Sequence, residues 1–531
     1  MRARPLGLGA LTAVCALMAA ACGSGKSIIV AGNDTPTATT VVTPSPPPTS
    51  AAPGTTLPGS EGSLPPPTTA SGEQPPPTPP ATSATTTTTP LAALPDCPVD
   101  ALADATEPVE ITFWHGLNVD NQEALQRVVD EYNASQTRVR VNAQNQGGYL
   151  ETIDKYYQSN QSDRPGVVMF PEYTVQRAID SQSMIPVQAC AEASAIDMSV
   201  FQPATIAAYS AAGVQWGMPF NVSNPVLYYN KNIFTAAGLD PEHPPQNLDE
   251  LRRFSQQIVD SGAARYGLAI DSGSDSGGGW YLEQWFANMG ELYADNGNGR
   301  LAPATRVLYD GPAGVQLLSY VQSLINDGLA FYVGDNAGGA DQLLKLADTN
   351  APATMAIGTS AGLGTVLNVL AGGLVPDLGA EDVGVGPLPG PGPEPTALVG
   401  GAALYVTDGK DDVETAAAWD FVQYMVSAET QSLFATLTGY VPVRADALEI
   451  EPALSVYRDD PRFRVAYDQL VKSPDSPALQ GPILGPQREI RSITASAVAE
   501  IFTGGDVQTA LTAAAAQSND LLASYNASNE G

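Results

Sequence analysis

One stretch has the spacing that places a reactive serine at a sharp turn between a strand and a helix, GTSAG at residues 358–362. A hydrolase of the α/β-hydrolase class needs an acid and then a histidine later in the chain than such a serine. The only two histidines, His115 and His243, both come before it. This order excludes a serine hydrolase of the α/β-hydrolase class, and a serine hydrolase with another order of its catalytic residues is the remaining alternative.

The acidic residues suggest two other kinds of chemistry. DNGNG at residues 295–299 looks like the start of a calcium loop, but Arg306 stands where such a loop needs its last acid. Two of the 56 Asp and Glu residues might form the carboxylate pair of a glycan hydrolase, although nothing singles out a pair. An exported glycan hydrolase therefore stays open as an alternative, and the sequence predicts no metal and no cofactor.

The 531-residue chain is strongly acidic, and its charge is unevenly placed. It has 24 Lys and Arg residues against 56 Asp and Glu residues, a net charge of −32. The charges up to Pro95 cancel, so the whole excess lies on residues 96–531. Because phosphate backbones need a positive surface, nucleic acid is excluded as a partner. Distributed negative charge suits a soluble monomer.

The first residues are typical of an export signal. Arg2 and Arg4 precede an apolar run that ends in AAAC at residues 19–22. Small residues before a cysteine resemble the bacterial lipobox, although Ala19 stands where Leu is commoner. We expect residues 1–21 to be a lipoprotein signal peptide and Cys22 to be lipidated, which anchors the protein to the outer side of the cell membrane. The alternative is an ordinary signal peptide cut nearby.

Residues 22–95 form a segment rich in Pro and Thr. Of the 45 prolines, 17 fall between Ser27 and Pro95. Such a composition cannot bury enough apolar surface to offset the entropy of ordering. It predicts a disordered tether that would reach on the order of 200 Å if fully extended, although neutral filler is the alternative.

Two cysteines remain once Cys15 leaves with the signal and Cys22 carries lipid. They are Cys97 and Cys190. An even pair in an exported chain predicts a disulfide between them.

Residues 96–531 alternate between strand and helix patterns. Short apolar runs predict strands at residues 109–114, 139–141 and 166–170, and helical spacing of apolar residues predicts helices over 121–133, 149–157, 415–425 and 487–502. This alternation predicts an α/β fold with largely parallel sheets. Because so long a body exceeds one core, we expect two lobes.

Several short stretches of residues 96–531 match, in sequence and in order, those of one known protein family. They are FWH at 113–115, MPFNVSNPVLYYNK at 218–231, AGLDP at 237–241, GGA at 400–402, TGYVPV at 438–443 and REIR at 488–491. Together they resemble extracellular solute-binding proteins of bacterial ABC importers, above all those for glycerol 3-phosphate or glycerophosphodiesters. The resemblance implies a two-lobe periplasmic-binding-protein fold of type II, whose lobes are joined by crossover hinge segments. We expect lobe 1 at about 96–220 and 357–402, and lobe 2 at about 221–356 and 403–531.

The resemblance also implies the ligand contacts. They fall at Tyr149, Glu172, Ser223, Trp280, Thr359, Ser360, Gly401, Tyr440 and Arg491. Thr359 and Ser360 are both included because the match can slip by one residue. Tyr rings can stack on a polyol, and a carboxylate at the end of a strand can accept from hydroxyls. The ordinary alternatives are core aromatics, a solvated acid and turn hydroxyls.

Arg491 carries most of the expected ligand chemistry, because a guanidinium offers forked donors that match phosphate oxygens. Its alternative is a surface salt bridge. The glycerol-3-phosphate binders of the family place two Trp residues in a loop before a helix. Here that loop is residues 271–279, where only Trp280 matches and the other position falls at about Gly277. The loss weakens the case for free glycerol 3-phosphate.

The resemblance therefore implies an importer component and not an enzyme, and the lipobox-like start of the chain adds the expected lipid anchor. It would capture a glycerophosphodiester or a glycerol 3-phosphate-like ligand between two lobes and deliver it to ABC permease subunits. A neutral oligosaccharide is the alternative ligand, and sensing without transport is an alternative role. The acidic body disfavours an anionic ligand at long range.

Overall fold

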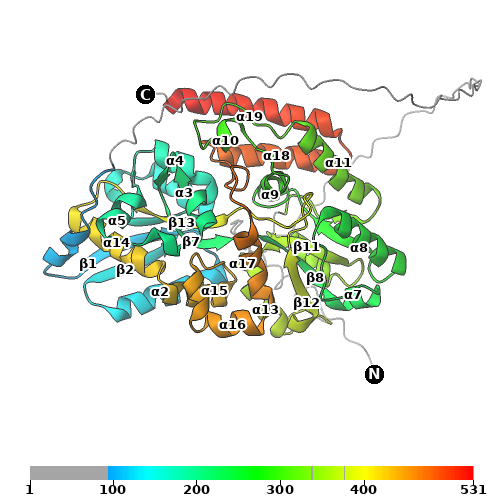
Figure 1. Ribbon diagram of the computed structural model, residues 1–531, viewed down its shortest axis with the longest axis horizontal. Coiled ribbons are helices and arrows are strands. Elements are labelled where there is room, and N and C mark those ends of the chain that lie inside the picture. The colour runs from blue at the N-terminus through cyan, green and yellow to red at the C-terminus, as the bar shows by residue number, and fades with distance from the viewer. Residues whose placement is uncertain (1–93, 337–338, 376, 530–531) are drawn as a thin grey trace, which may run out of the picture. The chain divides into compact units, whose positions relative to one another are not determined.

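The structure is a computed structural model, and it describes residues 94–529 except residues 337, 338 and 376. The predicted signal peptide, Cys22 and nearly all of the tether lie outside the described residues. The described body holds two main sheets, each covered by helices (Figure 1). Among the described residues, no helix is both long enough and apolar enough to span a bilayer.

The first lobe is built on a sheet with the order β2-β1-β3-β13-β4, and β7 also pairs with β13. Its strands are β1 Val109–His115, β2 Val139–Asn145, β3 Val167–Pro171, β4 Met184–Ile185, β7 Met218–Ser223 and β13 Gly400–Thr407. Its helices are α2 Val119–Ser135, α3 Tyr149–Gln158, α4 Val175–Asp180, α5 Val187–Ala193, α6 Pro203–Ala208, α14 Asp412–Met425 and α15 Ala428–Thr438. A small hairpin joins β5 Ser210–Ala211 to β6 Val214–Gln215.

The second lobe is built on a sheet with the order β10-β9-β11-β8-β12. Its strands are β8 Pro225–Asn230, β9 Tyr266–Ile270, β10 Ala330–Tyr332, β11 Ala353–Thr359 and β12 Val383–Pro387. The helices of this half are α7 Lys231–Ala236, α8 Leu248–Ser261, α9 Trp280–Asn288, α10 Asp295–Asn298, α11 Pro312–Asn326, α12 Asp341–Leu344, α13 Leu363–Ala371, α17 Arg462–Lys472, α18 Gln487–Phe502 and α19 Val507–Asn529. Helix α16, Ala453–Asp459, links α15 to α17, which packs on β12.

The predicted strands and helices are confirmed, but the sheets are mixed rather than largely parallel. Strands β1, β2 and β3 are parallel, whereas β13 runs antiparallel to β3. Strand β8 likewise runs antiparallel to β11 and β12. The reason is the chain path, because β13 and β8 each enter their sheet from the other lobe.

The expected lobe boundaries need two corrections. Residues 357–387 do not belong to lobe 1, because β11 and β12 both pair with β8 in the second sheet. Residues 403–438 do not belong to lobe 2, because β13 pairs with β3 and α14 packs on β1. The chain changes lobes through Asn224, between β7 and β8, again through residues 388–399, and a third time between α15 and α17, through the segment that holds α16.

The predicted disulfide is confirmed. Cys97 is bonded to Cys190 across 93 positions of sequence, and this bond joins the segment before a 3-10 helix at Val99–Asp104 to α5 of the first lobe. Cys190 is fully buried. The start of the described body is therefore covalently fixed to the first lobe.

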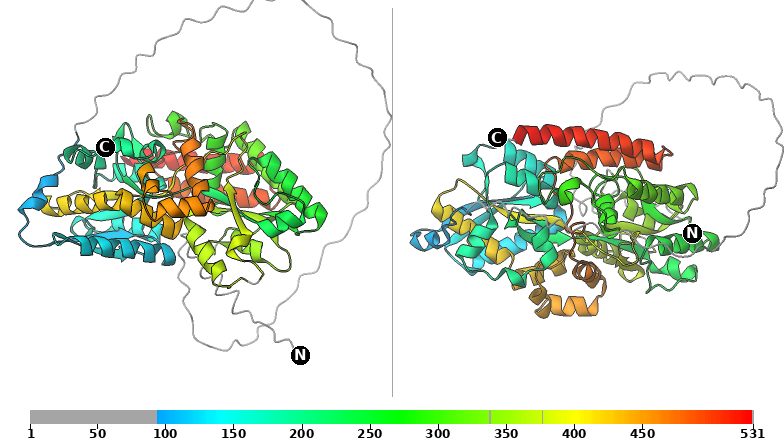
Figure 2. Two further views of the ribbon diagram at one scale, coloured as in Figure 1. Left: turned by 60° about the horizontal axis from the view of Figure 1, so that its bottom comes forward. Right: turned by 45° about the horizontal axis from the view of Figure 1, so that its top comes forward.

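The last two helices connect the lobes on one side. Helix α19 packs on α18 and α11 and extends to α4 of the first lobe (Figure 1; right view of Figure 2). The Tyr525 hydroxyl there donates to Asp180 at 2.8 Å. Arg300, just after α10, donates to the carbonyls of Ala207 and Ser210 at 2.8 and 3.0 Å.

Candidate functional site

A buried ion cluster joins the two lobes. Arg491 on α18 donates through Nε and Nη2 to the two carboxylate oxygens of Glu283 on α9, at 2.8 and 2.7 Å. The same Nη2 donates to Glu172 of the first lobe at 2.9 Å. The side chains of Arg491 and Glu283 are 3% and 2% exposed, so this pair is shielded from water, whereas the Glu172 side chain is 15% exposed.

Each member of the cluster is positioned by its element. Glu172 begins a 3-10 helix, Glu172–Thr174, directly after the fully buried β3, so its carboxylate lies at the carboxyl end of the sheet. Arg491 lies one turn after Gln487, whose side-chain amide donates to Glu283 at 3.2 Å. The Tyr173 ring lies beneath the guanidinium, 4.9 Å from its carbon, which adds a cation–π contact.

Three consecutive glycines bring the loop before α9 against α18. A Cβ on Gly277 would overlap the carbonyl oxygen of Asp271, and a Cβ on Gly278 would press on Ala495 of α18. A Cβ on Gly279 would lie 3.1 Å from the Arg491 Cβ. The position of the missing second Trp therefore has no room for a side chain, because the loop is folded tightly onto itself.

The charges of the cluster strongly perturb one another. Burial raises the pKa of Glu172 to about 7, although Arg491 opposes the rise. Burial alone would lower the pKa of Arg491, but the Glu283 and Glu172 carboxylates outweigh that effect and raise it. Arg491 is therefore a permanent cation, whereas Glu172 can take up a proton near neutral pH.

A second polar group lies at the start of α3. The Asn221 side-chain amide donates to the Tyr149 hydroxyl at 2.8 Å, and Tyr149 is also hydrogen-bonded to Tyr440. Tyr209 lies near both groups, and burial together with the nearby Glu172 and Tyr440 raises its pKa. Tyr440 itself stacks on Phe434, with ring centroids 5.6 Å apart.

The remaining predicted residues lie where the chain crosses between lobes. Ser223 ends β7 and pairs with Gly400 of β13, next to Gly401, whose φ of +87° favours glycine. A Cβ on Gly401 would also overlap the Asn221 carbonyl oxygen, so only glycine fits there. Trp280 begins α9, and its ring fills the space beside Gly400.

Thr359 ends β11 and caps the 3-10 helix Ser360–Gly362, in which Ser360 is the first residue. The Thr359 hydroxyl accepts from the Ala361 amide at 3.2 Å. The Ser360 amide and hydroxyl bond the backbone of Asn224 at 3.0 and 3.4 Å. In this structure both hydroxyls therefore stabilise backbone at the junction.

Three buried polar atoms around these groups have no hydrogen-bond partner among the described residues. They are Tyr209 Oη, Asn221 Oδ1 and Trp280 Nε1. Each such atom costs about 1–3 kcal/mol when it is left unpaired. A ligand rich in hydroxyls would offer the donors and acceptors that these atoms lack.

Sequence reasoning missed Glu283, Asn221 and Tyr209. Glu283 had a detectable signal, since it is the one acid in a helix, Trp280–Asn288, that is apolar on most positions, and a buried acid needs a cationic partner. Asn221 and Tyr209 gave no comparable signal, because their roles depend on contacts with distant parts of the chain.

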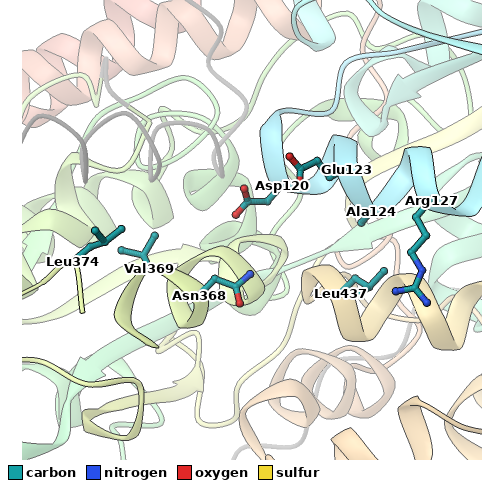
Figure 3. A pocket seen from close by; sticks show the side chains of 8 residues that line it. All are labelled: Asp120, Glu123, Ala124, Arg127, Asn368, Val369, Leu374 and Leu437. Carbon is teal, nitrogen blue, oxygen red and sulfur yellow. The ribbon is translucent and has the colours of Figure 1, made fainter. Parts of the chain in front are cut away.

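A separate pocket of about 470 Å³ spans the junction between α2, α13 and α15 (Figure 3). It is lined by Asp120, Glu123, Ala124, Arg127, Asn368, Val369, Leu374 and Leu437, and none of the predicted ligand contacts is among them. Beside it, the Asn121 amide donates to the Ala361 carbonyl at 3.4 Å, so α2 contacts the second lobe there.

Replacing Glu172 with Gln should change how stability depends on pH. A carboxyl whose pKa is raised in the folded state, here from 4.5 to about 7, contributes stability below pH 4.5 that is lost as the pH rises through 7. Between about pH 4 and 8, wild type should lose up to about 3 kcal/mol of unfolding free energy relative to Glu172→Gln. Urea unfolding at several pH values measures this, with Glu489→Gln, an exposed acid on α18, as control. Parallel pH profiles for wild type and Glu172→Gln would contradict the assignment.

A two-lobe α/β body whose charged and polar side chains meet across the junction defines the class of proteins that close on a small solute. The model of the bacterial extracellular solute-binding protein family matches residues 127–464, and the chain belongs to this family.

Several relatives have a name that includes a ligand. The sn-glycerol-3-phosphate-binding periplasmic protein UgpB of Pectobacterium atrosepticum is 26% identical over 438 residues, 80% of this chain and 94% of the relative. UgpB of Rhizobium meliloti is 26% identical over 429 residues, 79% of this chain and 95% of the relative.

Two solved structures share the fold. UgpB from Mycobacterium tuberculosis in complex with glycerophosphocholine matches with a TM-score of 0.62 and 20% identity, and covers 79% of this chain and 99% of its own. The cyclic alpha-maltosyl-1,6-maltose binding protein of Arthrobacter globiformis matches with a TM-score of 0.62 and 23% identity, and covers 78% of this chain and 99% of its own.

Proposed function

We propose that the chain is the lipid-anchored solute-binding component of a bacterial ABC importer. It captures a small polyhydroxylated solute between its lobes, with glycerophosphodiesters and related glycerol compounds as the first candidates, and presents it as a monomer to permease subunits. The observation that carries this proposal is the junction itself, where Glu172 of one lobe and Arg491 of the other meet at 2.9 Å. The relatives named for glycerol 3-phosphate support the choice of a glycerol compound.

A neutral oligosaccharide is the second candidate ligand. The solved neighbour from Arthrobacter is named for a maltose-type sugar. Tyr149, Tyr440 and Trp280 are aromatic groups of the kind that stack on sugar faces.

The contacts of the cluster argue against a glycan hydrolase. Glu172 and Glu283 form the carboxylate pair at the junction, and both lie within 2.9 Å of the same Arg491 nitrogen. A hydrolase needs room between its two carboxylates for the sugar bond and a water. Here the guanidinium fills that space, so the pair favours binding over catalysis.

Isothermal titration calorimetry with glycerophosphocholine, glycerol 3-phosphate and maltose tests the proposal. We expect saturable one-to-one binding of at least one solute, and chromatography of the recovered solute should show no breakdown. A chain that binds none of the three, or that converts one of them, would contradict the proposed function.

A further inference from the structure

Glu283 accepts from the two N–H groups of Arg491 that would otherwise donate to a phosphate. A guanidinium recognises phosphate through two parallel N–H groups on one edge. In this site the edge formed by Nε and Nη2 is bonded to both oxygens of Glu283, at 2.8 and 2.7 Å. The other edge of the guanidinium is formed by Nη1 and Nη2, and its Nη2 hydrogen is already donated to Glu172. Neither edge can therefore offer a ligand two donors. Nη1 has no hydrogen-bond partner among the described residues, so it is the group left for a ligand.

The charges that surround Arg491 do not favour an anion either. Two carboxylates, Glu172 and Glu283, face one guanidinium. A third carboxyl, that of Asp275, is close enough to interact electrostatically with Arg491 and Glu283. Arg488, the next cation on α18, is paired with Asp154 at 2.9 Å. A phosphate monoester, which carries a charge of about −1.5 to −2 at neutral pH, would therefore meet like charge at close range.

We propose that Glu283 is the residue that sets the charge of the ligand, so that the site selects a polyhydroxylated solute without net negative charge. This inference rests on the proposed function, since it assumes that the solute binds at Arg491. Uncharged sugars and zwitterionic phosphodiesters satisfy it, whereas free phosphomonoesters do not. Glu283 can impose this choice because its own position is fixed by Gln487 on one side and by α9 on the other.

Calorimetry on wild type and Glu283→Gln tests the proposal. Wild type should bind glycerol 3-phosphate at least about tenfold more weakly than the better of glycerophosphocholine and maltose. In Glu283→Gln, which keeps a side chain of the same size and leaves Arg491 paired with Glu172 alone, that ratio should shrink by at least about tenfold. Glu489→Gln removes an exposed acid from the same helix as Arg491, and it should leave the ratio unchanged.

A second measurement keeps the charge assignment testable whichever solute binds. Inorganic phosphate should raise the melting temperature of Glu283→Gln and leave that of wild type unchanged. If phosphate stabilises neither protein, or both equally, the proposal is overturned, as it is if wild type prefers glycerol 3-phosphate. A wild type that binds none of the three solutes would contradict the proposed function instead, and the phosphate measurement would still decide the role of Glu283.

Discussion

Replacing Arg491 with Ala should weaken solute binding by at least about 100-fold and lower the free energy of unfolding by about 3–5 kcal/mol. The substitution leaves Glu172 and Glu283 buried beside each other without a cation. Two such carboxylates repel, and one of them must take up a proton for the fold to persist. Calorimetry and urea unfolding at pH 7.5 measure the two effects.

The matched control for Arg491 is its neighbour on the same helix. Arg488 pairs with Asp154 at the same 2.9 Å distance, but these side chains are 32% and 45% exposed. Arg488→Ala should therefore cost no more than about 1 kcal/mol. If the two Arg variants lose similar stability, burial is not what makes the Arg491 cluster important, and the assignment of this site fails.

The second large effect concerns the disulfide. Replacing Cys97 and Cys190 with Ala should lower the free energy of unfolding by about 4–5 kcal/mol, because the bond closes a loop of 93 residues in the unfolded chain. Urea unfolding of both proteins, with and without a reducing agent, measures this effect.

Two comparisons keep the disulfide result clear. The reducing agent should destabilise wild type by a similar amount and leave the double Ala variant unchanged. If the double Ala variant loses less than about 1 kcal/mol of unfolding free energy, residual structure already limits the conformations of the unfolded chain without the disulfide.

Local patterns were sufficient for much of the fold. The fully apolar β3 and the helical spacing of α2 and α18 each indicated an element that the structure confirms. The disulfide followed from counting cysteines in a chain that is expected to be exported. These predictions succeeded because each depends on residues that are near one another in sequence, or, for the disulfide, on the two cysteines that remain when Cys15 and Cys22 are set aside.

The arrangement of the lobes and the partner of Arg491 could not be obtained in this way. The direction in which β8 and β13 enter their sheets depends on how the chain crosses at Asn224 and residues 388–399. Glu283 and Arg491 are 208 positions apart, and many acids could have paired with that Arg. The resemblance placed Glu172 and Arg491 in one set of expected ligand contacts, and the structure brings the two side chains within 2.9 Å, but the resemblance gave no sign that Glu283 holds one edge of the guanidinium.

The bond between Cys97 and Cys190 also determines how the body carries mechanical load. The described chain enters the first lobe at Leu94, three residues before Cys97. A pull from that end reaches the buried α5 through a covalent bond, so it bypasses the 3-10 helix Val99–Asp104 that would otherwise peel away first. In the proposed lipid-anchored importer component, a pull on the anchor would therefore be borne by the first lobe.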